Sequence, residues 1–131
     1  MTVICPYCNQ EAKQVKGSEI YTNLKHLHHL TFWQCEPCKA YVGCHKHTGE
    51  PLGTLAKKDL RTKRQDTHLL FDPLWKRDGL KYFKNRGRAY RWLANAMGIP
   101  KDQCHIALFD LEQCEEAITH IYSLRMEVCM A

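Results

Sequence analysis

Hydrophobic and polar residues follow one pattern in the first part of the chain and a different one after it. Residues 3–44 contain short runs rich in β-branched and aromatic residues, at 18–22 and 31–35. Turn-forming residues at 9–11 and 16–18 bound these runs. Such a pattern is typical of short strands joined by turns. We therefore expect a small β module in this part of the chain.

Beyond an irregular loop with several glycines, the apolar spacing becomes helical. A helix is expected from about Leu55 to Phe71, with Leu60 and Thr67 facing a core. Its basic residues, expected near the opposite side, are Lys57, Lys58, Arg61 and Arg64. Asp72-Pro73 should end this helix, because the residue before a proline is disfavoured in helical conformation.

Two further helices are expected. The first runs from about Gly87 to Met97 and ends at Gly98, a favoured residue just past a helix. Residues 104–109 are expected to form a short buried strand or extended stretch. Asp110 with Gln113 resembles a capping box, which predicts a third helix from Asp110 to about Leu124.

The four cysteines of two C-x2-C motifs are the clearest chemical signal. Cys5 and Cys8 form one motif, Cys35 and Cys38 the other, and 26 residues separate them. Two residues between thiolates let one tight turn present both sulfurs to the same ion, and two such turns complete a tetrahedral zinc site. A single motif of this kind would also fit a redox pair, and eight cysteines in 131 residues would also fit a disulfide scaffold.

Zinc is the better interpretation because the first residues show no signal peptide, so a cytoplasmic protein is expected. No apolar run approaches the roughly 18 residues of a membrane span, so no membrane partner is expected. We expect one structural zinc ion, closed by four cysteines. The predicted fold class is α+β: a zinc-ribbon module over residues 1–50 packed on a mainly helical region over 51–131, as one compact unit.

Histidines and cysteines beyond the motifs offer further chemistry. Cys44 and His47 could share a second metal ion with two distant ligands. His45, His68 and Asp72 could form an acid–base or metal site. We expect His45, Arg64, His68 and Asp72 to lie near one another. Cys104 and His105 could join such a site as well. The alternative is that Cys44 and Cys104 are small buried residues and the histidines satisfy backbone groups.

The charge of the chain is concentrated in its middle. Residues 57–91 carry twelve Lys or Arg and four Asp or Glu, whereas residues 101–131 carry two and six. Aromatic residues are interleaved with the cations, which is typical of nucleic-acid binding and also of a solvated helix face beside a core. The residues expected to contact nucleic acid are Lys57, Lys58, Arg61, Arg64, Lys81, Lys84, Arg86 and Arg88.

An ordered set of motifs between residues 4 and 118 resembles a family of small zinc-finger-containing proteins of bacteria and their phages. These motifs are Cys5-Pro6-Tyr7-Cys8, Trp33-x-Cys35-x-x-Cys38, Tyr41-Val42-Gly43-Cys44-His45, residues 51–56, Leu60-Arg61-x-x-Arg64-x-x-x-His68, residues 71–75, residues 88–94, Cys104-His105-Ile106 and Phe109-Asp110. The resemblance implies a zinc finger fused to a helical region and no particular activity. The chain has His47 where the family pattern has glycine.

Three functions compete at this point. The first is a nucleic-acid-binding zinc-ribbon protein, such as an accessory factor of phage or mobile-element DNA metabolism. The second is a metal-dependent nuclease that uses His45, His68 and Asp72, although few carboxylates lie near these histidines in the sequence. The third is a phage-type inhibitor or adaptor that binds a host protein through the acidic tail, residues 110–127, or the region of Trp75.

Overall fold

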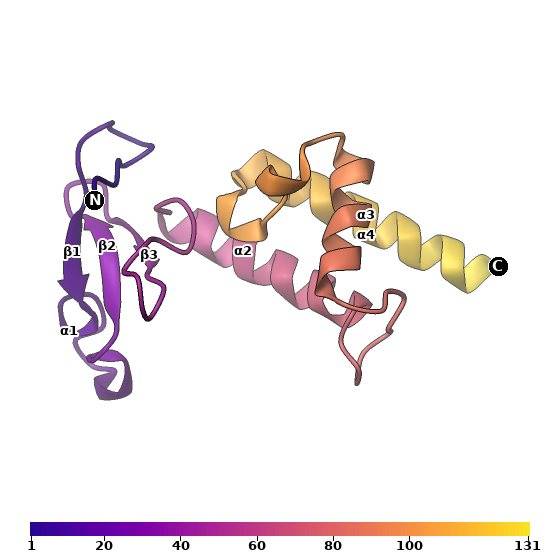
Figure 1. The fold of residues 1–131 in the computed structure, drawn as a ribbon, viewed down its shortest axis with the longest axis horizontal. Coiled ribbons are helices and arrows are strands. Elements are labelled where there is room, and N and C mark those ends of the chain that lie inside the picture. The colour runs from indigo at the N-terminus through magenta and orange to yellow at the C-terminus, as the bar shows by residue number, and fades with distance from the viewer. The chain divides into compact units, whose positions relative to one another are not determined.

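The fold was obtained as a computed structural model that describes residues 1–131. The chain divides into two compact units, which we call the ribbon unit (residues 1–59) and the helical unit (residues 60–131). Figure 1 shows a small sheet in the first and packed helices in the second, as the α+β fold class requires. No helix in the chain combines the length and the apolar character needed to cross a membrane.

The ribbon unit is built on a three-stranded antiparallel sheet in the order β1-β2-β3. The strands are β1 (Lys13–Lys16), β2 (Thr31–Cys35) and β3 (Ala40–Gly43). A short helix, α1 (Gly17–Ile20), and a 3-10 turn, η1 (Lys25–Leu27), lie between β1 and β2. The strand predicted at 31–35 is confirmed.

Alternation along β2 gives the sheet two different faces. Trp33 and Cys35 point to one face, where they join a buried cluster that includes Leu55. Phe32 points to the other face, where its ring packs edge-on against Tyr21 and Tyr41, with ring centroids 5.7 and 5.8 Å away. Successive side chains of a strand point to opposite faces, so this one strand supplies both apolar clusters.

The prediction of a strand at 18–22 was wrong. The ladder ends at Gly17, whose N–H donates to the Leu30 carbonyl. A Cβ on Gly17 would lie 1.8 Å from the Leu27 carbonyl oxygen, so only glycine permits this close approach. The chain then turns into α1, and Tyr21 packs against Phe32 instead of pairing in the sheet. Tertiary packing outweighs the β propensity of this run.

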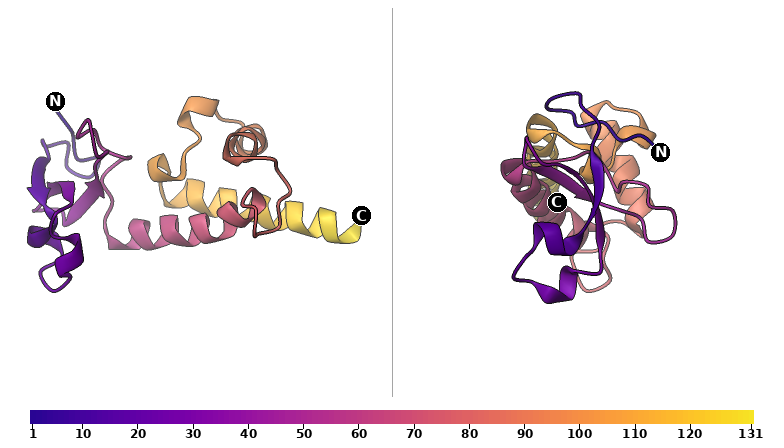
Figure 2. Two further views of the ribbon diagram at one scale, coloured as in Figure 1. Left: turned by 60° about the horizontal axis from the view of Figure 1, so that its bottom comes forward. Right: turned by 90° about the vertical axis from the view of Figure 1, so that its left-hand side faces the viewer.

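Three long helices joined by 3-10 turns form the helical unit, and the first of them begins in the last two residues of the ribbon unit. The helices are α2 (Lys58–Phe71), α3 (Arg86–Met97) and α4 (Leu111–Met130). The turns are η2 (Asp72–Leu74), η3 (Lys101–Gln103) and η4 (Ile106–Leu108). Figure 2 shows α2 and α4 side by side, an arrangement that the ion pair between Lys63 and Glu115 also requires.

The buried face of α2 corrects one expectation. Leu60, Arg64, Thr67 and Phe71 are all buried, and their spacing places them on one side of the helix. Arg64 therefore lies on the core face and not on the exposed one. Its Nε donates a hydrogen bond to the Phe109 carbonyl oxygen at 2.9 Å, which satisfies a charged group in the interior.

The helix ends follow local chemistry. The Asn85 side chain accepts from the Arg88 N–H and caps α3, and Gly98 ends it in the left-handed region with φ 69°. The capping box of Asp110 and Gln113 is confirmed, because each side chain accepts from the backbone N–H of the other residue. The third helix is longer than predicted and reaches Met130.

The expectation of a strand or extended stretch at 104–109 was wrong. Half of this segment forms η4, since no neighbouring strand is there to pair with it, and only His105 and Phe109 on either side of η4 have extended backbone. Three of its apolar residues are buried, as expected, since Cys104, Ile106 and Phe109 have no exposed surface, whereas Leu108 is exposed. The backbone N–H of Ile106 donates to the Tyr90 hydroxyl at 3.5 Å instead of to a sheet.

Shortening Leu93 to alanine should destabilise the helical unit. Leu93 is completely buried, so its truncation removes apolar contacts and leaves a cavity, at a cost of about 2–5 kcal/mol. The matched change Leu69→Ala, at a side chain that is 73% exposed, should alter the free energy of unfolding by less than about 0.5 kcal/mol. Urea unfolding measures both, and equal effects would contradict this core assignment.

Candidate metal centre

The first cysteine motif is a tight turn closed by backbone hydrogen bonds. The Asn9 N–H donates to the Cys5 carbonyl at 2.8 Å, and the Cys5 N–H donates to the Gln10 carbonyl at 2.9 Å. Asn9 has φ 62°, in the left-handed region that asparagine tolerates better than most residues. This reversal brings Cys8 back beside Cys5.

The second motif repeats the same construction at the β2–β3 turn. Cys35 ends β2 and pairs with Ala40, the first residue of β3. Lys39, directly after Cys38, has φ 57°, so it occupies the position that Asn9 has in the first turn. Each motif is therefore a hairpin turn whose left-handed residue follows its second cysteine.

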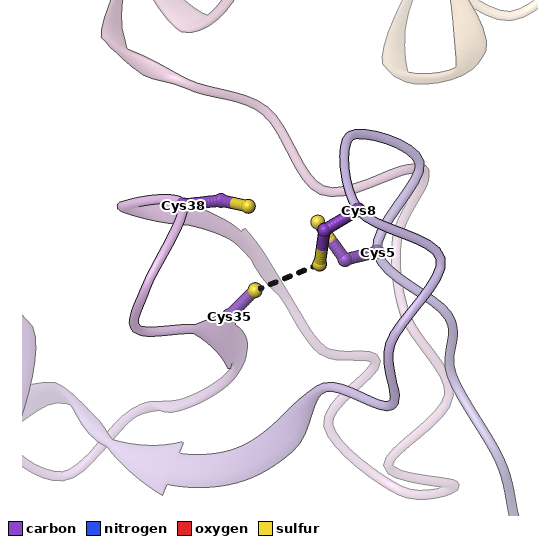
Figure 3. A group of neighbouring side chains, drawn as sticks. All are labelled: Cys5, Cys8, Cys35 and Cys38. Atoms are coloured by element: carbon purple, nitrogen blue, oxygen red, sulfur yellow. Dashed lines mark hydrogen bonds between the residues drawn. The ribbon is translucent and has the colours of Figure 1, made fainter.

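The four sulfur atoms converge on one point, as Figure 3 shows. All four lie within 4.8 Å of one another, and the Cys8 and Cys35 sulfurs are 3.6 Å apart. A tetrahedral zinc ion with Zn–S bonds of about 2.3 Å requires sulfurs roughly 3.8 Å apart. A disulfide requires about 2.05 Å, and all eight cysteines are free thiols. The geometry and the donor set both fit zinc.

Electrostatics within the cluster also call for a cation. The backbone hydrogen bond from Gln10 lowers the pKa of the Cys8 thiol. The hydrogen bond with Cys8, together with burial, raises the pKa of Cys38 to about 12. Four thiolates cannot accumulate this close together without a compensating charge. A divalent cation supplies that charge, and its binding releases protons.

The inner side of the cluster is apolar, whereas Cys8 and Cys38 on its outer side are half-buried. Cys5 and Cys35 are buried together with Ala12, Trp33 and Leu55 in the core of the ribbon unit. Four cysteine ligands leave no open coordination position for water or substrate, so the site is structural.

Tyr7, inside the first turn, is a contributor that the sequence did not single out. Its hydroxyl accepts from the Lys57 N–H at 3.0 Å, and the Lys57 ammonium lies 4.7 Å from the centre of its ring. This contact ties the end of the ribbon unit back to the metal turn. A tyrosine between two cysteine ligands does not by itself indicate a partner, so the sequence could not predict the contact with Lys57.

The proposed acid–base residues are divided between the two units. His45 is exposed in the ribbon unit, whereas His68 and Asp72 belong to the helical unit. His68 Nδ1 lies 3.9 Å from Asp72 Oδ1, and the Trp75 indole N–H donates to the same carboxylate oxygen at 3.3 Å. Burial lowers the pKa of His68 although Asp72 opposes that shift. The proximity of His45 to His68 stays a prediction.

The remaining cysteine–histidine pairs gather no second metal-binding group within either unit. Cys44 accepts a hydrogen bond from the Gln14 amide at 3.9 Å, and burial raises the pKa of its thiol. Burial likewise raises the pKa of Cys104 to about 11. The His105 ring packs edge-on against Tyr90 at 5.3 Å.

The basic residues expected to contact nucleic acid have different environments. Arg64 is buried and Arg61 is half-buried. The others are exposed: Lys57, Lys58, Lys81, Lys84, Arg86 and Arg88. Three cations of the same segment that were not singled out are exposed as well: Lys76, Arg77 and Arg91.

Comparison with known proteins agrees with the geometry of the cysteine cluster. The profile of a family described as a zinc-finger-containing domain matches residues 1–124. No curated protein and no solved structure matches the chain. The four-cysteine cluster and the family match together identify one structural zinc ion held by the ribbon unit.

Replacing Cys35 with serine should release the zinc and unfold the ribbon unit. A hydroxyl does not replace a buried thiolate ligand, and the small core depends on the ion for its stability. Elemental analysis and near-UV circular dichroism measure the two effects. The matched change Cys129→Ser, at an exposed thiol outside the cluster, should keep one zinc per chain. Retention of zinc by the Cys35 variant would contradict the assignment.

Replacing Lys39 with glycine should stabilise the zinc-loaded ribbon unit. Glycine adopts a φ of 57° without the steric cost that lysine bears, so we expect a gain of about 0.5–1 kcal/mol in thermal or urea unfolding. Lys39→Ala removes the same charge and keeps the strain, so it should give no gain. A gain shared by both variants would attribute the effect to charge instead.

Proposed function

The chain belongs to the family of zinc-finger-containing domains, and from that premise we propose that it binds nucleic acid through a basic surface formed by residues 76–91. The charge of this surface is the observation that carries the proposal. All seven of its Lys and Arg side chains are exposed, and Asp78 is its one acidic residue. Phosphate contacts from such cations release counterions, which is the main source of affinity for nucleic acid.

Few of these cations are neutralised within the protein. Lys76 is the one whose ammonium lies near a carboxylate, 4.0 Å from Asp72 Oδ2. The Lys81 ammonium donates to the Lys84 carbonyl at 3.3 Å, which leaves its charge uncompensated. A solvated face that served only solubility would carry both signs interspersed. The excess of one sign favours a polyanionic partner.

The first turn of α3 adds to this preference. Arg86 and Arg88 lie in that turn, and no acidic residue accompanies them. Cations beside the positive end of a helix dipole are unfavourable, whereas an anion bound there is favoured. A phosphate at this position would offset the repulsion that the two arginines experience in the free protein.

Aromatic side chains lie among the cations. The rings of Phe83 and Trp92 pack with centroids 5.5 Å apart, and both side chains are half-buried. Trp75 and Tyr82 are half-buried in the same segment. Partly exposed aromatic rings can stack on unpaired bases, so the surface suits single-stranded as well as double-stranded nucleic acid.

A role as an accessory factor in phage or mobile-element DNA metabolism is the finer form of this proposal. Its support is the resemblance of the sequence motifs to small proteins of bacteria and their phages. A cytoplasmic location accompanies this role.

A host-protein adaptor is the second candidate, and the last turns of α4 favour it. Tyr122, Met126 and Met130 are 51%, 63% and 81% exposed. Their spacing of four residues places them on one side of α4, and a contiguous exposed apolar patch marks a protein-interaction site. This candidate would be favoured if the unmodified protein bound a host protein and no nucleic acid, and if Met126→Asp abolished binding of that host protein.

Changing Arg86 and Arg88 together to alanine should weaken binding and its salt dependence. If about four to six phosphates are contacted, the log–log salt slope should be roughly −3 to −5 and become shallower by about 2 in the variant. Zinc content should not change. Fluorescence anisotropy with labelled DNA and RNA at several salt concentrations measures the slope.

The control variant is Arg125→Ala, which removes one cation from α4 outside the basic surface. Its salt slope should match that of the unmodified protein. Affinity weaker than about 100 μM at roughly 50 mM salt for every DNA and RNA form would overturn the proposal.

A further inference from the structure

A cavity of about 470 Å³ lies on the ribbon unit, away from the basic surface in sequence. Residues of β1, β2 and the end of β3 line it, together with the loop at 44–52. Its volume falls in the range of about 300–1,000 Å³ that small-molecule sites occupy. Nothing in the zinc site requires this cavity, so its lining needs a separate explanation.

The loop that closes one side of the cavity is held firmly in place. The His45 N–H donates to the Glu50 carbonyl at 2.8 Å, and the Leu52 N–H donates to the Gly43 carbonyl at 2.9 Å. The indole N–H of Trp33 donates to the Gly49 carbonyl at 2.8 Å, which ties the loop to the core of the ribbon unit. The cavity wall is therefore formed before any ligand binds.

The floor of the cavity is apolar, and Leu52 packs over a glycine in it. Phe32 pairs with Gly43 across β2 and β3. A Cβ at Gly43 would lie 3.2 Å from Leu52 Cδ1 and 3.9 Å from Phe32 Cε1, so the glycine lets the Leu52 side chain pack closely over the strand. The ring of Phe32 is itself fixed by its edge-on contacts with Tyr21 and Tyr41.

The polar groups that line the cavity are hydrogen-bonding and basic side chains. Gln14 and Thr31 offer hydrogen-bond donors and acceptors from the face of the sheet that carries Trp33, whereas Phe32 and Gly43 line the cavity from the opposite face. His29, His45 and Lys46 are exposed and also line the cavity. No carboxylate lines it. An apolar floor, neutral hydrogen-bonding groups and a cationic side together suit a flat heteroaromatic ring that carries an anionic group.

We propose that this cavity binds one nucleotide, with its base over Phe32 and Leu52 and its phosphate near His45 and Lys46. The inference rests on the proposed function for its class of ligand, since an unpaired nucleotide of a bound strand is one source of that chemistry. A free nucleoside monophosphate is the other source. The two sources are separated by experiment.

Cys44 provides a direct probe because its half-buried thiol lines the cavity. Zinc protects the four cysteines of the cluster, and Cys104 and Cys114 are buried. The exposed Cys129 serves as an internal reference in the same molecule. A ligand in the cavity should therefore slow alkylation of Cys44 and leave that of Cys129 unchanged.

The experiment measures iodoacetamide labelling of the zinc-loaded full chain by mass spectrometry. The probes are the four nucleoside 5′-monophosphates, an eight-nucleotide single strand and inorganic phosphate. At ten times its Kd, a bound nucleotide should slow Cys44 labelling roughly tenfold relative to Cys129. Inorganic phosphate should protect far less, because it leaves the apolar floor uncovered.

The double variant His45→Ala with Lys46→Ala should lose most of this protection. The matched variant His26→Ala with Lys16→Ala removes one histidine and one lysine of the ribbon unit that do not line the cavity, and it should keep the protection. Equal zinc content in both variants shows that the ribbon unit is intact. Protection that survives in the first variant, or equal protection by phosphate, would overturn the nucleotide site.

The outcomes also separate this inference from the proposed function. Protection by a monophosphate without binding of any strand would support the cavity as a free-nucleotide site. It would also overturn the proposal that the basic surface binds nucleic acid. Strand binding with no protection of Cys44 by any probe would keep the basic surface and overturn the cavity site.

Discussion

Four thiolates that repel one another, and the cation that binds them, determine the ribbon unit. The two cysteine turns are separated in sequence, and the chain between them forms β1 and β2. Few large side chains other than Trp33 and Leu55 are buried in the core around the cluster. So small a core contributes too little free energy to hold the sheet alone. The ion therefore stabilises the strands and loops that depend on the turns.

The loop at 44–52 and the two faces of β2 depend on the core that the zinc ion stabilises. Trp33 packs beside the zinc ligand Cys35 in the core, and its indole N–H holds the loop at 44–52 through Gly49. The same strand presents Phe32 to the opposite face. A metal site that only stabilises can thus hold in place a loop that lines a cavity of the ribbon unit. The helical unit has its own apolar core and presents its cations on α3 and the loop before it.

Local chemistry made part of this structure predictable. The cysteine spacing predicted the zinc site, and the capping box of Asp110 predicted the start of α4, because both signals lie within a few residues. Arg64 was misplaced because its spacing from Leu60 fits the core face, whereas its charge suggested solvent; the Phe109 carbonyl that satisfies it is distant in sequence. The turn at Gly17 depends on the Leu27 carbonyl. Contacts of this kind join residues that are distant in sequence, so they are identified only once the fold is known.

The most direct test of the account is an NMR titration of the isotope-labelled chain with zinc after chelation under reducing conditions. Without metal, resonances of residues 1–59 should collapse to the narrow range of an unfolded chain, while residues 60–131 keep dispersed signals. One equivalent of zinc should restore the first set, and a second equivalent should change nothing. A ribbon unit that stays folded without metal would contradict the claim that the ion determines its structure.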